Sequence, residues 1–330
     1  MGVTRPNRAL PLLLGAWLSL PAAAQSPATT PDTAPTPPAP TPVFIQAPKH
    51  RLLLHNATAF RANPLGLENQ TRLGYQSVLF RSDALLLRDN YLYLGGIVKL
   101  SPAFIKVGPL VEVQPLSILT LRLLGEYVDF FGTFNALQGF SSPNQNYSPT
   151  RLVERGDARE NHASGGLHAQ VEPLLSIKGG PLLLRNRFSL DYWSMNLREG
   201  ERVWYDVTLD TLLPRQGLSL ANELDVLFMG VPSVIVGARY SVLKPLYTPR
   251  DFAPGESEVE SNGQQRLGLL AAYIFKDQPY TKFNRPTLLL NVAWYLQHRY
   301  RAGQEVSRST PYLTLAFSFQ SDLLGAGPQP

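Results

Sequence analysis

The stretch 116–130, LSILTLRLLGEYVDF, decides the fold class of this chain. Leu119 and Leu121 alternate with Thr120 and Arg122, so apolar and polar side chains point to opposite faces of an extended strand. A helix would instead repeat its apolar residues every three to four positions. The stretch therefore predicts a β-strand with one face in an apolar medium and the other in a polar one.

The same alternation recurs along the chain in strand-sized segments separated by turn residues. No apolar run after residue 50 approaches the roughly 18 residues that a membrane-spanning helix needs. Repeated alternating segments of about ten residues are typical of a transmembrane β-barrel. We predict strands at 50–61, 70–81, 90–100, 103–114, 116–130, 165–177, 182–195, 202–213, 218–229, 233–243, 265–276, 287–300 and 309–319.

Barrels made from one bacterial chain normally have an even number of strands, so a set of thirteen is wrong by one. The two longest connections, 131–164 and 244–264, enclose five predicted strands, although two loops on the same side must enclose an even number. We therefore expect an additional strand within 131–164, around Tyr147 to Glu154. The fold class is then an all-β antiparallel barrel of fourteen strands, with twelve as the alternative.

The composition agrees with a barrel. Only 17% of the residues are charged, while 44% are hydrophobic and the mean hydropathy is −0.09. A soluble domain carries about 25% charged residues, whereas a barrel places apolar side chains toward lipid and polar ones in its lumen. The net charge of +5 is not concentrated in a basic run, so we expect no nucleic-acid partner. The absence of cysteine excludes disulfides, thiolate metal sites, cysteine catalysis and a lipoprotein anchor.

The N-terminus predicts export. Arg5 and Arg8 precede a short apolar run over 9–20, and small residues end at Ala24, so residues 1–24 are expected to be a cleaved signal peptide. Residues 25–49 are rich in Pro, Thr and Ala and predict an extended tether without a core.

Aromatic residues gather near the ends of the predicted strands. Such residues favour the boundary between membrane and water, where an apolar ring and a polar tip are both satisfied. We expect this position for Tyr91, Tyr127, Phe130, Phe131, Tyr192, Trp193, Trp204, Tyr205, Trp294 and Tyr300.

The last predicted strand carries a resemblance to a known class. Tyr312 to Phe319, YLTLAFSF, alternates strictly and closes on an aromatic residue. It resembles the C-terminal strand of bacterial outer-membrane β-barrel proteins, which usually stop at this terminal Phe, whereas here a tail at 320–330 follows. The resemblance covers 50–319 and implies a Gram-negative outer-membrane location. The implied partners are the lipid bilayer and the outer-membrane assembly machinery, which would recognise the strand ending at Phe319.

One short motif invites comparison with an outer-membrane enzyme. His162-Ala-Ser164-Gly-Gly is similar to the His-x-Ser-Asn-Gly stretch of outer-membrane phospholipase A, in which His would deprotonate Ser. Gly165 replaces the Asn of that stretch, Ser176 stands where the third catalytic residue is needed, and Asn186 is a poor substitute. We therefore expect no catalytic residues and no enzyme, with a lipid hydrolase as a minor alternative.

Metal and cofactor sites are not expected either. The histidines are scattered and lack the spacing of a metal site. The acidic residues Asp251, Glu256, Glu258 and Glu260 lack the order of a calcium loop, so a solvated charged loop is the better interpretation.

The remaining chemistry lies on the polar faces of the strands. A porin-like channel for small polar solutes is the function that we expect, and a closed structural or adhesive barrel is the alternative. Arg122, Arg185 and Arg187 are expected to form a positive wall, and Asp206, Asp210, Glu223 and Asp225 a negative one, giving a field that selects solutes. The candidate lumen-facing residues are Lys106, Arg122, Glu126, Glu172, Arg185, Arg187, Asp191, Asp206, Asp210, Glu223, Asp225, Arg239 and Arg299.

Overall fold

The computed structural model describes residues 48–257, 261–277 and 281–325. The expected signal peptide and all but the end of the expected tether lie outside the described residues, as do Glu258 and Glu260. Residues 45–330 belong to one compact unit, and the following description concerns that unit.

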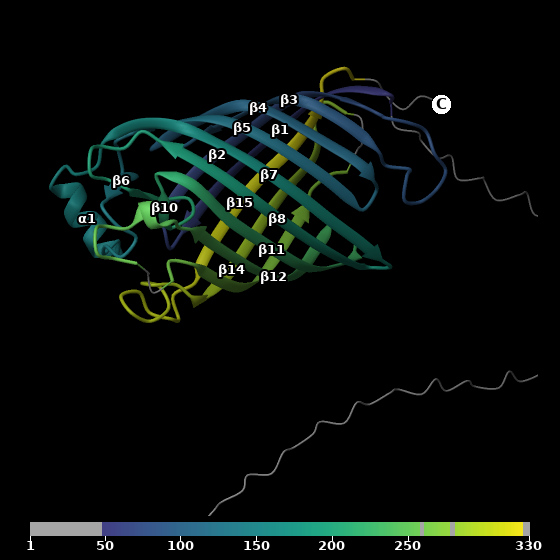
Figure 1. The fold of residues 1–330 in the computed structure, drawn as a ribbon. Coiled ribbons are helices and arrows are strands. Elements are labelled where there is room, and N and C mark those ends of the chain that lie inside the picture. The colour runs from purple at the N-terminus through teal and green to yellow at the C-terminus, as the bar shows by residue number, and fades with distance from the viewer. Residues whose placement is uncertain (1–47, 258–260, 278–280, 326–330) are drawn as a thin grey trace, which may run out of the picture. The chain divides into compact units, whose positions relative to one another are not determined.

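Twelve antiparallel strands form one closed barrel, shown in Figure 1. Each strand is hydrogen-bonded to two neighbours, and β1 and β15 close the ring, with Leu53 opposite Asp322. The last strand therefore continues past Phe319. In ring order the strands are β1 (His50–Ala62), β15 (Tyr312–Asp322), β14 (Asn284–Gln297), β13 (Gln264–Ile274), β12 (Val234–Leu246), β11 (Gln216–Val231), β8 (Leu182–Met195), β7 (Ala163–Gly179), β5 (Leu119–Phe131), β4 (Phe104–Leu116), β3 (Tyr91–Leu100) and β2 (Gly66–Ser77).

The expected fourteen strands are wrong, and the structure has the alternative number, twelve. The segment 202–213 does not join the barrel. It forms the hairpin of β9 (Val203–Asp206) and β10 (Thr211–Pro214), which pairs with β6 (Leu137–Phe140) in a separate three-stranded sheet. We call β6, β9 and β10 the plug sheet.

The additional strand expected around Tyr147 to Glu154 is a helix, α1 (Pro149–Asp157). Ser148 caps it by accepting a hydrogen bond from the Arg151 amide, and Pro149 occupies the first turn. Both are helix-start signals. Because 202–213 is not a barrel strand, four barrel strands lie between the two long connections. The even number is therefore reached by losing one of the thirteen expected strands, not by adding a fourteenth.

The two ends of the barrel differ. At one end lie the start of β1, the end of β15 and the short turns 117–118, 180–181 and 232–233. At the other end, which we call the loop end, lie the connections 132–162, 196–215, 247–263 and 298–311. The plug sheet and α1 belong to these long connections and lie at the loop end in Figure 1.

The outer wall is apolar. Leu123 on β5, Val171 on β7 and Leu269 on β13 are 42–64% exposed, whereas Arg122 and Glu172, one position away, form an ion pair on the inner face. A wall this apolar requires a non-aqueous environment. Among the described residues no helix is long and apolar enough to span a bilayer.

The aromatic residues divide into two groups. Tyr127, Phe131, Tyr192 and Trp294 are exposed on the outer wall. For Phe130, Trp193, Trp204 and Tyr205 the expected boundary position is wrong, because all four are buried at 0–3% exposure. Tyr91 turns inward to donate a hydrogen bond to Glu112, and Tyr300 lies in the connection 298–311. Sequence proximity to a strand end did not reveal which aromatic rings would pack inside.

Candidate functional site: the barrel lumen and its plug

A band of alternating charges runs across the inner face of six neighbouring strands. Arg122 on β5 lies between Glu112 on β4, at 2.7 Å, and Glu172 on β7, at 2.6 Å. These residues stand directly opposite one another in the strand register, which brings their side chains together without any long-range packing. The charge belt consists of Glu112, Arg122, Glu172, Arg185, Arg187, Glu223, Asp225 and Arg239.

The same pairing continues through the other half of the belt. Arg185 lies 2.6 Å from Asp225, and Arg239 bonds to the same carboxylate at 2.7 Å. Glu223 receives Arg239 at 3.2 Å and Arg187 at 3.4 Å. Cations and anions therefore alternate from strand to strand, and the expected separation into a positive and a negative wall is wrong.

Part of the belt can be reached by water. The side chains of Arg185, Arg187 and Glu223 point inward and yet remain 28%, 37% and 29% exposed. The lumen therefore contains open space beside β8 and β11. On the inner faces of β1, β3, β4 and β5 lies instead a buried apolar cluster that includes Leu53, Ile97 and Leu110.

A second polar group lies on the inner face of β5, β7 and β8. His168 contacts Glu126 through Nδ1 and Asp191 through Nε2, both at 2.9 Å, and stacks on Trp193 with 3.9 Å between ring centroids. Lys99 lies 2.9 Å from Glu126. Both ring nitrogens of His168 are thus occupied by carboxylates, an arrangement that leaves neither nitrogen to activate a nucleophile.

The plug sheet closes the loop end of the lumen. Trp204 of β9 is fully buried and packs edge-on against Phe130 of β5 and Trp193 of β8, with centroids 5.6 and 5.5 Å apart. Leu137 of β6 and Leu213 of β10 complete the same core. Apolar residues of the barrel wall and the plug sheet therefore form one continuous core, which fixes the sheet against β4, β5 and β8.

The turn between β9 and β10 reaches the opposite walls as well. Lys106 on β4 is 4.0 Å from Asp206, and the side-chain amide of Gln264 on β13 donates to the Leu209 carbonyl. In the ring of twelve, β4 and β13 stand six strands apart. A turn that contacts both must cross the lumen.

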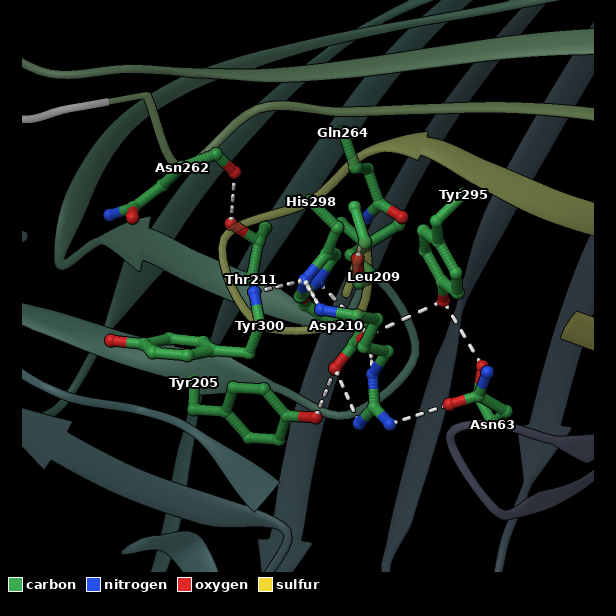
Figure 2. Close-up of polar contacts among 12 residues, drawn as sticks. Asn63, Tyr205, Leu209, Asp210, Thr211, Asn262, Gln264, Tyr295, His298 and Tyr300 are labelled. Carbon is green, nitrogen blue, oxygen red and sulfur yellow. Dashed lines mark hydrogen bonds and ion pairs between the residues drawn. The ribbon is translucent and has the colours of Figure 1, made fainter. Parts of the chain in front are cut away.

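Asp210 anchors this turn, as Figure 2 shows. Its carboxylate accepts a hydrogen bond from Tyr205 at 2.7 Å, and lies 3.3 Å from the Tyr295 hydroxyl and 3.1 Å from His298 Nε2. Arg301 Nε approaches it to 2.5 Å. We call Asn63, Tyr205, Asp210, Tyr295, His298 and Arg301 the Asp210 cluster.

The charge of Asp210 is stabilised despite its burial. Burial alone raises the pKa of a carboxyl group, but the hydrogen bond from His298 and the charge of Arg301 outweigh it, so the pKa of Asp210 lies well below its ordinary value. Arg301 also donates to the Asn63 side chain at 2.7 Å, and Tyr295 donates to the Asn63 carbonyl at 3.1 Å. The cluster thereby ties the plug sheet to the β1–β2 turn, to β14 and to the β14–β15 connection.

The structure places the candidate lumen residues in two ways. Ten of them lie on the inner faces of barrel strands: Lys106, Arg122, Glu126, Glu172, Arg185, Arg187, Asp191, Glu223, Asp225 and Arg239. Three do not belong to a barrel strand. Asp206 and Asp210 lie on either side of the turn between β9 and β10. Arg299 lies in the β14–β15 connection, where it donates to the carbonyls of Pro143 and Asn144.

The sequence analysis did not predict the partners of Asp210. One feature of the sequence did indicate that 203–213 is not a wall strand. In 203–213 the neighbours Trp204 and Tyr205, and again Leu212 and Leu213, are both apolar, which breaks strict alternation. Apolar residues on both faces indicate a segment buried on both sides, as the plug sheet is. His298 and Arg301 carry no comparable signal, because their role depends on where the β14–β15 connection folds.

The His162–Ser164 motif is not assembled as a catalytic pair. Among the described residues no hydrogen bond joins them: His162 lies 3.8 Å from Glu201, and the Ser164 hydroxyl donates to the Asn196 carbonyl. Asn186 bonds to Asn222 instead. The acidic stretch is likewise dispersed, since Asp251 accepts bonds from Thr248, and no three metal-ligating side chains converge in the described part of the chain.

Known proteins resemble the chain only in overall structure. No family model and no curated protein sequence matches it. Among solved structures it is similar to the KdgM porin, with 7% identity and a TM-score of 0.35 over 82% of this chain and 99% of that one. It is also similar to the translocator domain of the autotransporter NalP from Neisseria meningitidis, with 10% identity and a TM-score of 0.39 over 84% and 89%. A third similar structure is OccAB1 from Acinetobacter baumannii, with 11% identity and a TM-score of 0.39 over 77% and 58%.

Proposed function

We propose that this chain is a porin-like barrel of the bacterial outer membrane, which admits small polar solutes and is closed at its loop end in the conformation described. The apolar outer wall supports the membrane location, because exposing such a band to water would be unfavourable. The observation that carries the channel function is the water-accessible, charged inner face beside β8 and β11. Paired charges there offer hydrogen-bonding groups to polar solutes without strong selection for one sign.

The plug sheet is then the gate. A barrel of twelve strands is wider than the eight-stranded kind that side chains alone fill, and here a folded segment fills the loop end. The second candidate is a closed structural barrel, with no transport. The continuous apolar core of Trp204, Phe130 and Trp193 favours it, since displacing such a core exposes apolar surface.

Planar-bilayer conductance separates the two candidates. Ser194 and Gln216 are register partners on β8 and β11, so residues 197–214 can be replaced by a short Gly/Ser turn without altering the strand pairing of the barrel. We expect low conductance for the wild-type protein and a large, steady conductance for the variant. Folding of the variant is checked by heat-modifiable gel mobility.

The ion selectivity of the opened variant tests the lining. Replacing Arg185 and Arg187 by Ser leaves Glu223 and Asp225 with fewer cations, so selectivity should move toward cations. A correctly folded variant that conducts no ions would leave the closed structural barrel as the function. We propose no enzymatic activity, because His162 and Ser164 are not paired and His168 has no free ring nitrogen.

A further inference from the structure

A cleft of about 800 Å³ lies between two of the long connections at the loop end. It is bounded by Gly200–Arg202, by Arg215 and Gln216 at the start of β11, and by 248–251, which contains the short helix η1 (Pro249–Asp251). Neither the charge belt nor the Asp210 cluster contributes a residue to it. We call it the basic cleft because three arginines, Arg202, Arg215 and Arg250, line it.

The acidic residues of the cleft are already engaged. Asp251 is buried and accepts hydrogen bonds from the Thr248 amide at 2.6 Å and the Thr248 hydroxyl at 2.9 Å. Glu201 accepts a hydrogen bond from the Arg198 amide at 3.0 Å. In the described part of the chain no ion pair joins a carboxylate to Arg215 or Arg250, and both arginines are exposed. Arg215 and Arg250 therefore present positive charge that no carboxylate of the described residues pairs with.

Its position on the barrel is at the outer rim, not in the lumen. Gln216 belongs to the outward-facing set of β11, two residues before Leu218, and its side chain donates to the hydroxyl of the exposed Tyr192 at 3.0 Å. Lys244, the register partner of the outward-facing Leu220, is exposed near the same end of β12. Tyr192 and Lys244 lie where the apolar wall ends, which is the level that tyrosine and lysine favour at a membrane surface.

We propose that the basic cleft binds a phosphate group on the headgroup of an outer-leaflet glycolipid. The proposal rests on the proposed outer-membrane location. The long connections of such barrels face the cell exterior, so the rim of the loop end lies at the level of the outer-leaflet headgroups. Arginine suits this ligand because its planar guanidinium donates paired, charge-assisted hydrogen bonds to phosphate oxygens. A phosphorylated glycolipid also extends its acyl chains along the apolar wall below Tyr192, so one ligand satisfies both surfaces.

The test is native mass spectrometry of the full-length protein in detergent. The probes are bisphosphorylated lipid A, its dephosphorylated form, and inorganic phosphate as competitor. We expect retention of lipid A, and affinity about tenfold or more weaker for Arg215→Gln/Arg250→Gln, as expected when charge-assisted hydrogen bonds are lost. Arg215→Lys/Arg250→Lys should recover part of the binding.

Two exposed arginines outside the cleft supply the control. Arg151→Gln/Arg159→Gln removes the same charge from the region of α1 and should bind lipid A like the wild type. Equal binding of the dephosphorylated lipid, or equal loss in this control, would overturn the proposal. Displacement of lipid A by inorganic phosphate at comparable concentration would make the cleft a soluble-anion site instead. The mass-spectrometric test measures lipid binding and not conductance. Its result therefore stands even if the barrel proves not to conduct ions.

Discussion

The charge belt and the Asp210 cluster are both networks of ion pairs inside one barrel, but they are built differently. Belt residues such as Arg122 and Glu172 face each other on adjacent strands, and most carboxylates have a second arginine within reach. The cluster gathers residues from Asn63 to Arg301 around a single buried carboxylate. The ion pairs of the charge belt are therefore redundant and join adjacent strands. The contacts of the Asp210 cluster depend instead on how distant connections fold.

The largest effect is expected from breaking the cluster. Arg301→Ala removes the only arginine paired with Asp210 among the described residues and leaves the buried carboxylate with His298 and Tyr205 as its remaining partners. Such a loss costs about 3–5 kcal/mol. Urea unfolding of the refolded protein in detergent should show it.

The double variant Asp210→Asn/Arg301→Gln is the control for that measurement. It removes both charges, and asparagine tolerates the positive φ of 54° at position 210. The double variant should be more stable than Arg301→Ala alone. If both variants are equally unstable, charge pairing is not what holds the turn.

The second prediction tests which face of β5 points into the lumen, because the charge belt lies on that face. Leu123 lies next to Arg122 on β5 and is 43% exposed on the outer wall. Leu123→Arg places a charge toward hydrocarbon and should cost about 2–4 kcal/mol near the middle of the membrane. Unfolding in lipid vesicles measures it. Leu123→Ala controls for lost side-chain volume, and an arginine variant no less stable than this control would mean that the faces are assigned the wrong way round.

Acid should weaken the cluster within a defined range. Because the pKa of Asp210 is lowered in the folded protein, its ionised form adds stability above the unfolded value near 3.8. That contribution is lost as the pH falls below this value toward the folded pKa. The stability difference between wild type and Asp210→Asn/Arg301→Gln should therefore become less favourable to the wild type at acidic pH. A difference that does not change with pH would contradict the ionised state of Asp210.

The smallest effect is expected in the belt. Arg187 contacts Glu172 at 3.8 Å and Glu223 at 3.4 Å, but these carboxylates also have Arg122 and Arg239 as partners. Its side chain is also 37% exposed, so water screens the pairs. Arg187→Gln should change the free energy of unfolding by about 0–1 kcal/mol. A loss as large as that of Arg301→Ala would show that the belt is not redundant.

Much of the barrel wall could be predicted from the sequence, and the exception is instructive. The alternation in 116–130 and 182–195 corresponds to β5 and β8, with the expected residues on each face. The segment 202–213 alternates in part but forms the plug hairpin. Partial alternation does not distinguish a strand of the wall from a hairpin packed inside the lumen. The adjacent apolar pairs Trp204–Tyr205 and Leu212–Leu213 are what set the hairpin apart.

The sequence by itself determined the class, the faces of the strands and ten of the inward-facing charged residues, because a period of two is a local property of an extended chain. Only the tertiary structure decided that Arg185 is neutralised by Asp225, since register is set by pairing across strands. The tertiary structure also decided that the lumen is closed at the loop end. Tyr205, Asp210, His298 and Arg301 meet because the connections 196–215 and 298–311 fold back over the same end of the barrel. Contacts between loops far apart in sequence leave no periodic trace that a sequence pattern could reveal.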